Sequence, residues 1–272
     1  KTIEELKKDP NIEFAEPNYI VKSTLKPNDP LFLRQWAHKK MQSEQGWEIA
    51  DENRDLWSDE DIIIAIVDTG VNYNHPDLKS NIYSEGIDFY DWDNDAMDEN
   101  GHGTHVAGIA AAVTNNHVGI AGTCLNCKIL PIRFLGPRGD GSAYDAAASI
   151  IYAADSGADI ISNSWGSSYN SEMIHEAVIY AYSKGSIIIA AAGNNDRDSP
   201  FYPAAYPEAI AVAATDSSDK KAYFSNYGSW VDVSAPGQGI LSTYSQRFFL
   251  QNGTHIYYGY KLLSGTSMAA PF

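Results

Sequence analysis

The stretch DIIIAIVDTG, residues 61–70, contains six consecutive apolar residues, followed by an aspartate, a threonine and a glycine. A short apolar run that ends in turn residues is typical of a strand buried on both faces of a sheet. We therefore expect a buried strand here and in each later stretch of the same kind. Those stretches are CKILPIRFL (127–135), DIISNSW (159–165), SIIIAAAGN (186–194) and AIAVAATD (209–216).

Stretches with helical periodicity separate these runs, and Gly157 and Gly185 close two of them as helix C-terminal caps. The helical stretches are HVAGIAAAV (105–113), SAYDAAASIIYAADSGA (142–158) and SEMIHEAVIYAYSKG (171–185). Alternating helices and fully apolar strands are typical of a parallel sheet that is covered on both faces. The sequence thus predicts an α/β fold in three layers, with a mostly parallel central sheet between helices.

The composition excludes several classes of protein. The 272 residues carry a formal net charge of −16, and 44% of them are hydrophobic. A chain this apolar is not disordered. Nucleic acid and anionic membranes both attract basic surfaces, so neither is expected as a partner. No apolar stretch is long enough to cross a bilayer. The acidity fits a solvated, secreted surface or carboxylates that surround cations.

The two cysteines, Cys124 and Cys127, form a C-x-x-C motif. A redox or zinc site needs a helix start or a second pair of ligands, and this motif instead precedes an apolar strand. We expect a structural role, either as a local disulfide or as two thiols.

Polar residues follow three of the predicted strands, where ligands bind in parallel sheets. They are Asp68, the segment Ser164–Gly166 and Asn194. His102, in NGHGTHVAG, and Ser267, in SGTSMAAP, each stand at the expected start of a helix. A serine nucleophile needs a base, and the base needs an anion to fix its tautomer, so Asp68, His102 and Ser267 form a candidate triad.

Each member of this triad also has a simpler interpretation when taken alone. Asp68 could cap a turn, His102 could pair with His105 at a metal, and Ser267 could be an ordinary loop residue. A DTG triplet also occurs in aspartic proteases, but those need two such carboxylates and the triplet occurs once here. The combination of the three residues, in this order, is the informative feature.

The chain resembles the subtilisin family (subtilases) of serine peptidases, in particular its thermitase-like branch, from about Asn28 to the last residue. The motifs that carry the resemblance are IVDTGV, HPDL, NGHGTHVAG, AAVTNNHVGIAG, ISNSWG, AAAGN, YFSNYG and GTSMAAP. The resemblance implies a subtilisin-like fold and a secreted, monomeric serine endopeptidase with broad specificity for proteins and peptides. A non-catalytic relative that binds peptides or calcium is the alternative.

The resemblance also implies roles for the site residues. Asp68 orients His102, His102 is the general base and Ser267 attacks the scissile carbonyl, while Asn194 and the Ser267 N–H stabilise the oxyanion. The substrate backbone pairs along one segment, and a second segment forms the opposite wall of the pocket for the P1 side chain, the residue before the scissile bond. These segments are Ser164, Trp165 and Gly166, and Ala191, Ala192 and Gly193. Phe201 either fills that pocket or turns outward.

Structural calcium is expected at two places. DFYDWDNDAMDEN, residues 88–100, places five aspartates within eleven residues, and it resembles a thermitase-type calcium loop at Asp88, Asp91 and Asp93. Asp95 and Met97 depart from that pattern, and a solvated acidic loop is the alternative. The second candidate resembles the family's high-affinity site. Its ligands would be the side chains of Asp29, Asp77 and Asn116 and the carbonyls of Val113, Val118 and Ile120.

The ends of the chain give further expectations. Residues 1–24, with a capping box at Thr2 and Glu5, resemble the end of an inhibitory propeptide, or they are an ordinary extension. Residues 12–22 alternate like a strand, and residues 25–28 would be the linker where processing occurs. Residues 29–272 would then be a peptidase domain that lacks the C-terminal helices of its relatives, so that this chain would be weakly active or inactive.

Overall fold

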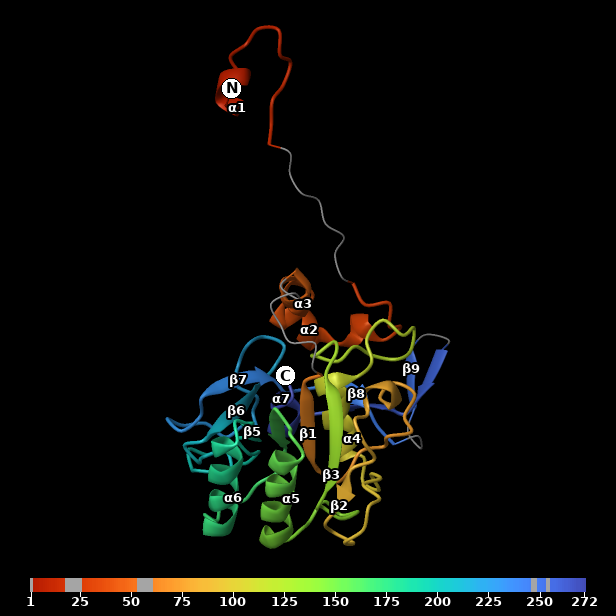
Figure 1. Ribbon diagram of the computed structural model, residues 1–272, viewed down its shortest axis with the longest axis vertical. Helices are drawn as coiled ribbons and strands as arrows, with labels where there is room; N and C mark the ends of the chain where they lie inside the picture. The colour runs from red at the N-terminus through yellow and green to blue at the C-terminus, as the bar shows by residue number, and fades with distance from the viewer. Residues whose placement is uncertain (1, 18–25, 53–60, 246–248, 253–254) are drawn as a thin grey trace.

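A seven-stranded sheet with the order β2-β3-β1-β4-β5-β6-β7 forms the centre of the protein in the computed structural model (Figure 1). The structure describes residues 2–17, 26–52, 61–245, 249–252 and 255–272. Every pair of neighbouring strands in this sheet is parallel. The strands are β1 (Ile63–Asp68), β2 (Ile87–Asp88), β3 (Lys128–Arg133), β4 (Ile160–Asn163), β5 (Ile187–Ala191), β6 (Ala209–Thr215) and β7 (Val233–Pro236).

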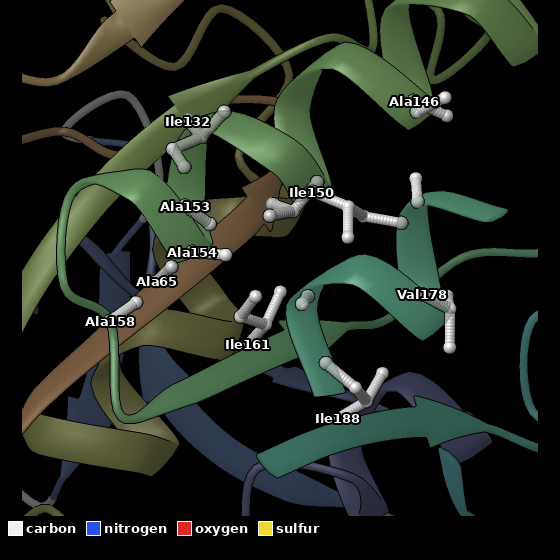
Figure 2. Packing of buried hydrophobic residues seen from close by; sticks show 14 of the residues in the cluster. Ala65, Ile132, Ala146, Ile150, Ala153, Ala154, Ala158, Ile161, Val178 and Ile188 are labelled. Carbon is white, nitrogen blue, oxygen red and sulfur yellow. The ribbon is translucent and has the colours of Figure 1, made fainter. Parts of the chain in front are cut away.

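Helices cover both faces of this sheet, as the alternating pattern predicts. On one face α5 (Ala143–Asp155) and α6 (Glu172–Ser183) pack over a core that includes Ala65 and Val67. Figure 2 shows Ile150 of α5 and Val178 of α6 beside Ile161 and Ile188 of the neighbouring strands. On the other face lies α4 (His102–Ala111) with α7 (Thr266–Ala269), packed against Ile64 and Ile66. The three-layer α/β prediction is confirmed.

The directions in which the β1 side chains point explain why the sequence could predict this arrangement. Side chains at successive positions point to opposite faces of a sheet, so an unbroken apolar run supplies both cores at once. The predicted caps are also correct, because Gly157 and Gly185 follow α5 and α6 with φ of +79° and +99°. Backbone of this kind favours glycine, which has no Cβ to clash.

Smaller elements surround the main sheet, and the sequence patterns predicted only the first of them. The helix α1 (Ile3–Leu6) has the predicted capping box. No strand forms over residues 12–17, so that part of the strand prediction is wrong, and residues 18–22 lie outside the described residues. The others are η1 (Phe32–Arg34), α2 (Trp36–Met41), α3 (Ser43–Glu52), η3 (Lys79–Asn81) and the antiparallel pairs β8 (Ile240–Thr243) with β11 (Tyr260–Leu263) and β9 (Phe249–Asn252) with β10 (His255–Tyr258).

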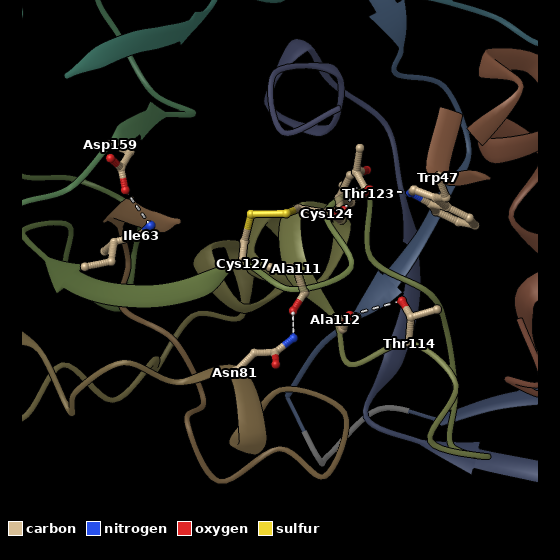
Figure 3. The surroundings of a disulfide bond; sticks show 11 residues. Trp47, Ile63, Asn81, Ala111, Ala112, Thr114, Thr123, Cys124, Cys127 and Asp159 are labelled. Carbon is tan, nitrogen blue, oxygen red and sulfur yellow. Dashed lines mark hydrogen bonds between the residues drawn. A yellow bond between two sulfur atoms is a disulfide. The ribbon is translucent and has the colours of Figure 1, made fainter. Parts of the chain in front are cut away.

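Cys124 and Cys127 form a disulfide between α4 and β3, which decides between the two structural alternatives (Figure 3). Cys124 N–H donates to the Ala110 carbonyl at 2.9 Å, so the disulfide loop is attached to the end of α4. The Trp47 indole N–H of α3 donates to the Thr123 carbonyl at 2.7 Å. The disulfide thus stiffens the loop that anchors α3.

Among the helices in the described part of the chain, none combines the length and the apolar character needed to span a bilayer.

Candidate active site

Asp68 and His102 are hydrogen-bonded at the carboxyl end of β1. The Asp68 Oδ1 atom accepts from His102 Nδ1 at 2.7 Å and from the Thr69 N–H at 2.7 Å. Asp68 is fully buried, whereas 27% of the His102 side chain is exposed. With Nδ1–H donated to the carboxylate, neutral His102 has its unprotonated Nε2 free for a proton from a nucleophile. The His102 ring faces solvent only in part, as expected for a base that works beside a bound substrate.

Burial lowers the pKa of His102, but two carboxylates oppose it. The charge and hydrogen bond of Asp68, together with the charge of Asp98, outweigh burial and raise the pKa of His102 above its ordinary value. The pair is therefore arranged to stabilise an imidazolium.

A frame of hydrogen bonds that the sequence analysis did not identify fixes His102 at the start of α4. The Asp98 carboxylate accepts from the Thr69 hydroxyl, from the N–H groups of Asn100 and Gly101, and from the N–H and hydroxyl of Thr104, at 2.6–2.9 Å. Asp98 thus joins the turn after Asp68 to the helix that carries His102. The sequence indicated Asp98 only as the last of the five aspartates of the acidic loop, four residues before His102.

Tyr244 also supports the turn before His102, through contacts with Asn100 and Gly101. Its hydroxyl donates to the Asn100 carbonyl at 3.0 Å, and its ring lies 2.4 Å from where a Cβ on Gly101 would stand. Gly101 also has a φ of +104°, so both the conformation and the contact require glycine.

Ser267 lies in the first turn of α7, as predicted, and is 9% exposed. Its hydroxyl donates to the Ser164 carbonyl at 2.9 Å, and the Ser164 hydroxyl donates to the Ser267 carbonyl at 3.0 Å. The segment after β4 is therefore attached directly to Ser267. α7 packs against α4, so one layer of the fold carries both His102 and Ser267.

Asn194 is held by the residue before Ser267. The Asn194 Oδ1 atom accepts from the Thr266 N–H at 2.8 Å and from the Thr266 hydroxyl at 3.1 Å. The same hydroxyl accepts from the Gly193 N–H at 3.0 Å. With its oxygen turned toward Thr266, the Asn194 amide leaves its N–H₂ group as a donor on the other side. Thr266, which no sequence motif singled out, connects the loop after β5 to α7.

The predicted substrate-binding segments lie on either side of Ser267. Ala191 and Ala192 are buried, and the Trp165 ring packs on Phe134 in the core at a centroid distance of 4.8 Å. The side chains of Ala191, Ala192 and Trp165 therefore pack on the core. Gly166 and Gly193 both contact the ring of Phe201, which lies between them.

Asp29, Asp77 and Asn116 come together as the resemblance implied. Asn116 donates from its side chain to Asp77 at 2.8 Å and from its N–H to Asp29 at 3.3 Å. Burial raises the pKa of Asp77 to about 7 and also raises that of Asp29. Among the described residues neither carboxylate has a basic partner within ion-pair distance. Two buried carboxylates beside an amide are a donor set that fits a hard cation.

The other expected calcium ligands of this site contribute their N–H groups to it. Val113 N–H donates to the Asp77 carbonyl, Val118 N–H to the Asn116 Oδ1 atom, and Ile120 N–H to the Asp77 Oδ2 atom, at 2.7–2.9 Å. These bonds fold the 113–120 loop tightly around Asp77.

The Asp-rich loop has an arginine partner that the sequence patterns did not indicate. The buried Arg133 guanidinium lies 2.6 Å from Asp88, 3.1 Å from Asp91 and 2.8 Å from Glu99. Asp93 and Asp95 accept from nearby N–H groups, and Asp95 also accepts from the Tyr73 hydroxyl at 2.7 Å. In the described part of the chain no three His, Cys, Asp or Glu side chains converge to hold a metal. An arginine thus supplies positive charge to this loop, and calcium at Asp88, Asp91, Asp93 and Asp95 stays a prediction.

Comparison with known proteins agrees with this geometry. Residues 59–272 match the model of the family described as "Subtilase family". The chain belongs to the subtilase family. A thermophilic serine proteinase of Bacillus sp. (strain AK1) is 44% identical over 99% of this chain and 63% of its own length. Thermitase of Thermoactinomyces vulgaris is 49% identical over 90% of this chain and 81% of its own length.

A solved structure supports the fold of this subtilase. A protease from Pseudoalteromonas arctica PAMC 21717 has a TM-score of 0.78 and 34% identity, over 92% of this chain and 84% of its own. The chain spans less than two thirds of the length of the Bacillus relative.

Proposed function

We propose that this protein is a serine endopeptidase that hydrolyses peptide bonds through an acyl-enzyme. The observation that carries the proposal is the 2.7 Å hydrogen bond between Asp68 and His102, at the sheet edge where Ser267 begins α7. A buried carboxylate, an oriented imidazole and a serine in a helix N-terminal turn are the parts that peptide hydrolysis by a serine requires.

In the proposed reaction the Ser267 hydroxyl transfers its proton to His102 Nε2 while Oγ attacks the scissile carbonyl carbon. His102 then gives this proton to the nitrogen of the leaving amine, and the C–N bond breaks to leave an ester on Ser267. A water molecule, deprotonated by His102, hydrolyses this ester. Asp68 stays ionised throughout and stabilises the imidazolium.

Two donors are available for the oxyanion that forms in each step. The Ser267 N–H belongs to the first turn of α7, where amides have no partner within the helix. The Asn194 amide group is oriented by Thr266 at the same end of the helix. Donors that are fixed before the reaction stabilise developing charge without reorganisation.

The substrate would bind as an added strand beside Ser164, Trp165 and Gly166. In this mode backbone hydrogen bonds supply much of the affinity, which gives broad specificity along most of the substrate. Before attack the Ser267 hydroxyl turns away from the Ser164 carbonyl and toward His102, which frees that carbonyl for the substrate backbone.

We further propose structural calcium at Asp29, Asp77 and Asn116, where it would neutralise two buried carboxylates. The proposed location is extracellular, because disulfides such as Cys124–Cys127 persist in oxidising surroundings. We also propose that residues 1–24 are the end of a propeptide, with processing within residues 25–28. The proposed partners are protein and peptide substrates and this propeptide, and the proposed state is a monomer.

A fluorophosphonate probe tests the catalytic proposal, because it reacts only with an activated serine. The full chain should be labelled at Ser267, and the Ser267→Ala variant should not be. The same variant should also lose the ability to hydrolyse peptide substrates. A folded protein that binds peptides but is not labelled would instead be the non-catalytic alternative.

A further inference from the structure

Two loops leave the same edge of the sheet beside Ser267. β4 and β5 are parallel neighbours, with Asn163 paired to Ala190, so the segments that follow them start side by side. Ser164 is bonded to Ser267 in both directions, and Gly193 is bonded to Thr266. The space between these two segments therefore opens next to the nucleophile. If the substrate backbone pairs beside Ser164 as proposed, its side chain next to the scissile carbonyl enters between these two segments.

The ring of Phe201 occupies this space. A Cβ on Gly166 would lie 2.5 Å from the Phe201 Cε1 atom, and one on Gly193 would lie 3.0 Å from its Cγ atom. Both distances are shorter than a normal contact between carbon atoms, which is about 3.5–4.0 Å. One aromatic ring thus lies directly against the backbones of both segments, which leaves no room for a second large side chain between them.

The backbone on both sides of Phe201 is fixed. Tyr202 and Ser167 exchange two hydrogen bonds of 2.8 Å, and the Phe201 carbonyl accepts from the Ala205 N–H at 2.9 Å. The Tyr202 ring packs on Tyr206 at 4.8 Å, and Tyr206 is bonded to the backbone of Ser171. The backbone of Phe201 could move away from Gly166 and Gly193 only if these contacts broke. The Phe201 ring therefore remains near the two glycines.

We infer that Phe201 restricts the P1 position to small side chains, so that the protein cleaves after glycine, alanine or serine in preference to large residues. This inference rests on the proposed function and names its substrate class. The ring contacts Gly166 and Gly193, and the proposed pairing of the substrate backbone beside Ser164 is retained. A phenylalanine or leucine at P1 would have to displace the ring of Phe201.

Peptide substrates that differ only at P1 test this inference. In the wild-type chain kcat/KM for P1 alanine should exceed that for P1 phenylalanine by about tenfold or more, since one unfavourable pocket contact can give 10–200-fold discrimination. Phe201→Gly should reverse the order, whereas Phe201→Tyr, which keeps a ring, should retain it. Tyr182→Ala removes an aromatic side chain that is 60% exposed on α6 and should leave the preference unchanged.

Two further measurements separate this inference from the proposed function. Fluorophosphonate labelling reports the activated serine and does not depend on a P1 side chain. Binding of the same peptides to Ser267→Ala, followed by fluorescence anisotropy, reports the pocket without catalysis. Labelling together with a P1 phenylalanine preference in the wild type overturns the inference and leaves the proposed function standing. Absence of labelling overturns the proposed function, and the binding series then decides the pocket: tighter binding of P1 alanine supports the inference and equal binding overturns it.

Discussion

Ser164 and Ser267 exchange two hydrogen bonds, in which each hydroxyl donates to the backbone carbonyl of the other residue at 3.0 and 2.9 Å. Ser164 is 3% exposed and Ser267 is 9% exposed, so both bonds are shielded from water. The loop after β4 and the first turn of α7 are therefore fixed to each other at the proposed nucleophile. The Ser164 side chain acts on the position of Ser267, in addition to the expected role of its backbone in substrate binding.

The first prediction concerns this pair. Ser164→Ala removes the donor to the Ser267 carbonyl and should lower the free energy of unfolding by about 1–3 kcal/mol, as for an unsatisfied buried acceptor. It should also slow fluorophosphonate labelling, because the first turn of α7 loses a support. Ser162→Ala is a matched control, since the buried Ser162 hydroxyl has no partner among the described residues. Equal effects of the two substitutions would show that the Ser164 bond does not position Ser267.

The second prediction concerns pH. His102 acts as a base only when it is neutral, so activity should fall as the pH drops through its pKa. Because Asp68 and Asp98 raise that pKa, the loss should occur above the ordinary value of about 6.5. The pH dependence of inactivation by a fluorophosphonate measures it directly. An apparent pKa below 6 would contradict the proposed balance of charges.

The stability contributed by the His102–Asp68 pair should have the opposite pH dependence. A raised pKa means that the folded state binds the proton more tightly, so this stabilisation is complete below about pH 6.5 and is lost as the pH rises through the folded pKa.

Asp68→Asn removes the charge and should reduce kcat by about 10⁴-fold. It should also shift the midpoint of the remaining activity to lower pH, which a merely unfolded variant would not show.

A third prediction concerns a buried histidine of α2. His38 is 1% exposed, contacts Ser43 and the Ala121 carbonyl, and packs against Trp47 and Phe272. Burial lowers the pKa of His38 to about 4. The unfolded chain therefore binds a proton that the folded chain does not, and stability should fall between about pH 6.5 and pH 4, by about 3 kcal/mol from this residue.

Urea unfolding at pH 7 and at pH 4.5 measures this third effect. The difference in free energy between the two conditions should be smaller in His38→Gln than in the wild type, although the variant is less stable at pH 7. The same pH difference in both proteins would exclude His38 as a source of acid sensitivity.

The fourth prediction concerns calcium. A ligand that binds only the folded state at 100 times its Kd adds about 2.7 kcal/mol to stability, so a chelator should lower the Tm. Asp77→Asn should abolish the chelator effect, because Asp77 is central to the proposed site. Asp93→Asn, in the Asp-rich loop, should leave that effect intact. A chelator effect that Asp93→Asn abolishes would move the calcium site to the Asp-rich loop.

The sequence predicted most of the sheet and the residues at its carboxyl edge for a simple physical reason. Strands buried on both faces are continuous apolar runs, and helix C-termini need glycine, so β1, α5 and α6 follow from local patterns. The helices α2 and α3 do not, because their stability comes from contacts of His38 and Trp47 with distant segments. Short motifs likewise indicated Asp68, His102, Ser267 and Asn194 as candidates.

Partners that come from distant strands were the part of the site that the sequence could not predict. Whether Phe201 turns inward depends on Gly166 and Gly193, which meet only in the folded chain. Thr266 was overlooked because its hydroxyl acts on Asn194 and Gly193, which are far away in the sequence. The charge and the resemblance of the acidic loop suggested a cation, but the loop gave no indication that Arg133, at the end of β3, lies against Asp88.

The fifth prediction follows from that arginine. The Arg133 side chain is 6% exposed, the Asp88 side chain is fully buried, and the Arg133 guanidinium also lies 5.3 Å over the Tyr90 ring. Arg133→Met leaves Asp88 as a buried, unpaired charge, and loss of one partner of a buried ion pair costs about 3–5 kcal/mol. Chemical unfolding should show this loss of stability. Added calcium should restore part of it only in the variant, since the freed carboxylates then lack a cation.

Arg138→Met is the matched control, because Arg138 is 84% exposed and its pair with Asp140 should have no measurable effect on stability. If the wild type gains as much stability from calcium as Arg133→Met does, the cation of this loop is calcium after all and the arginine does not replace it.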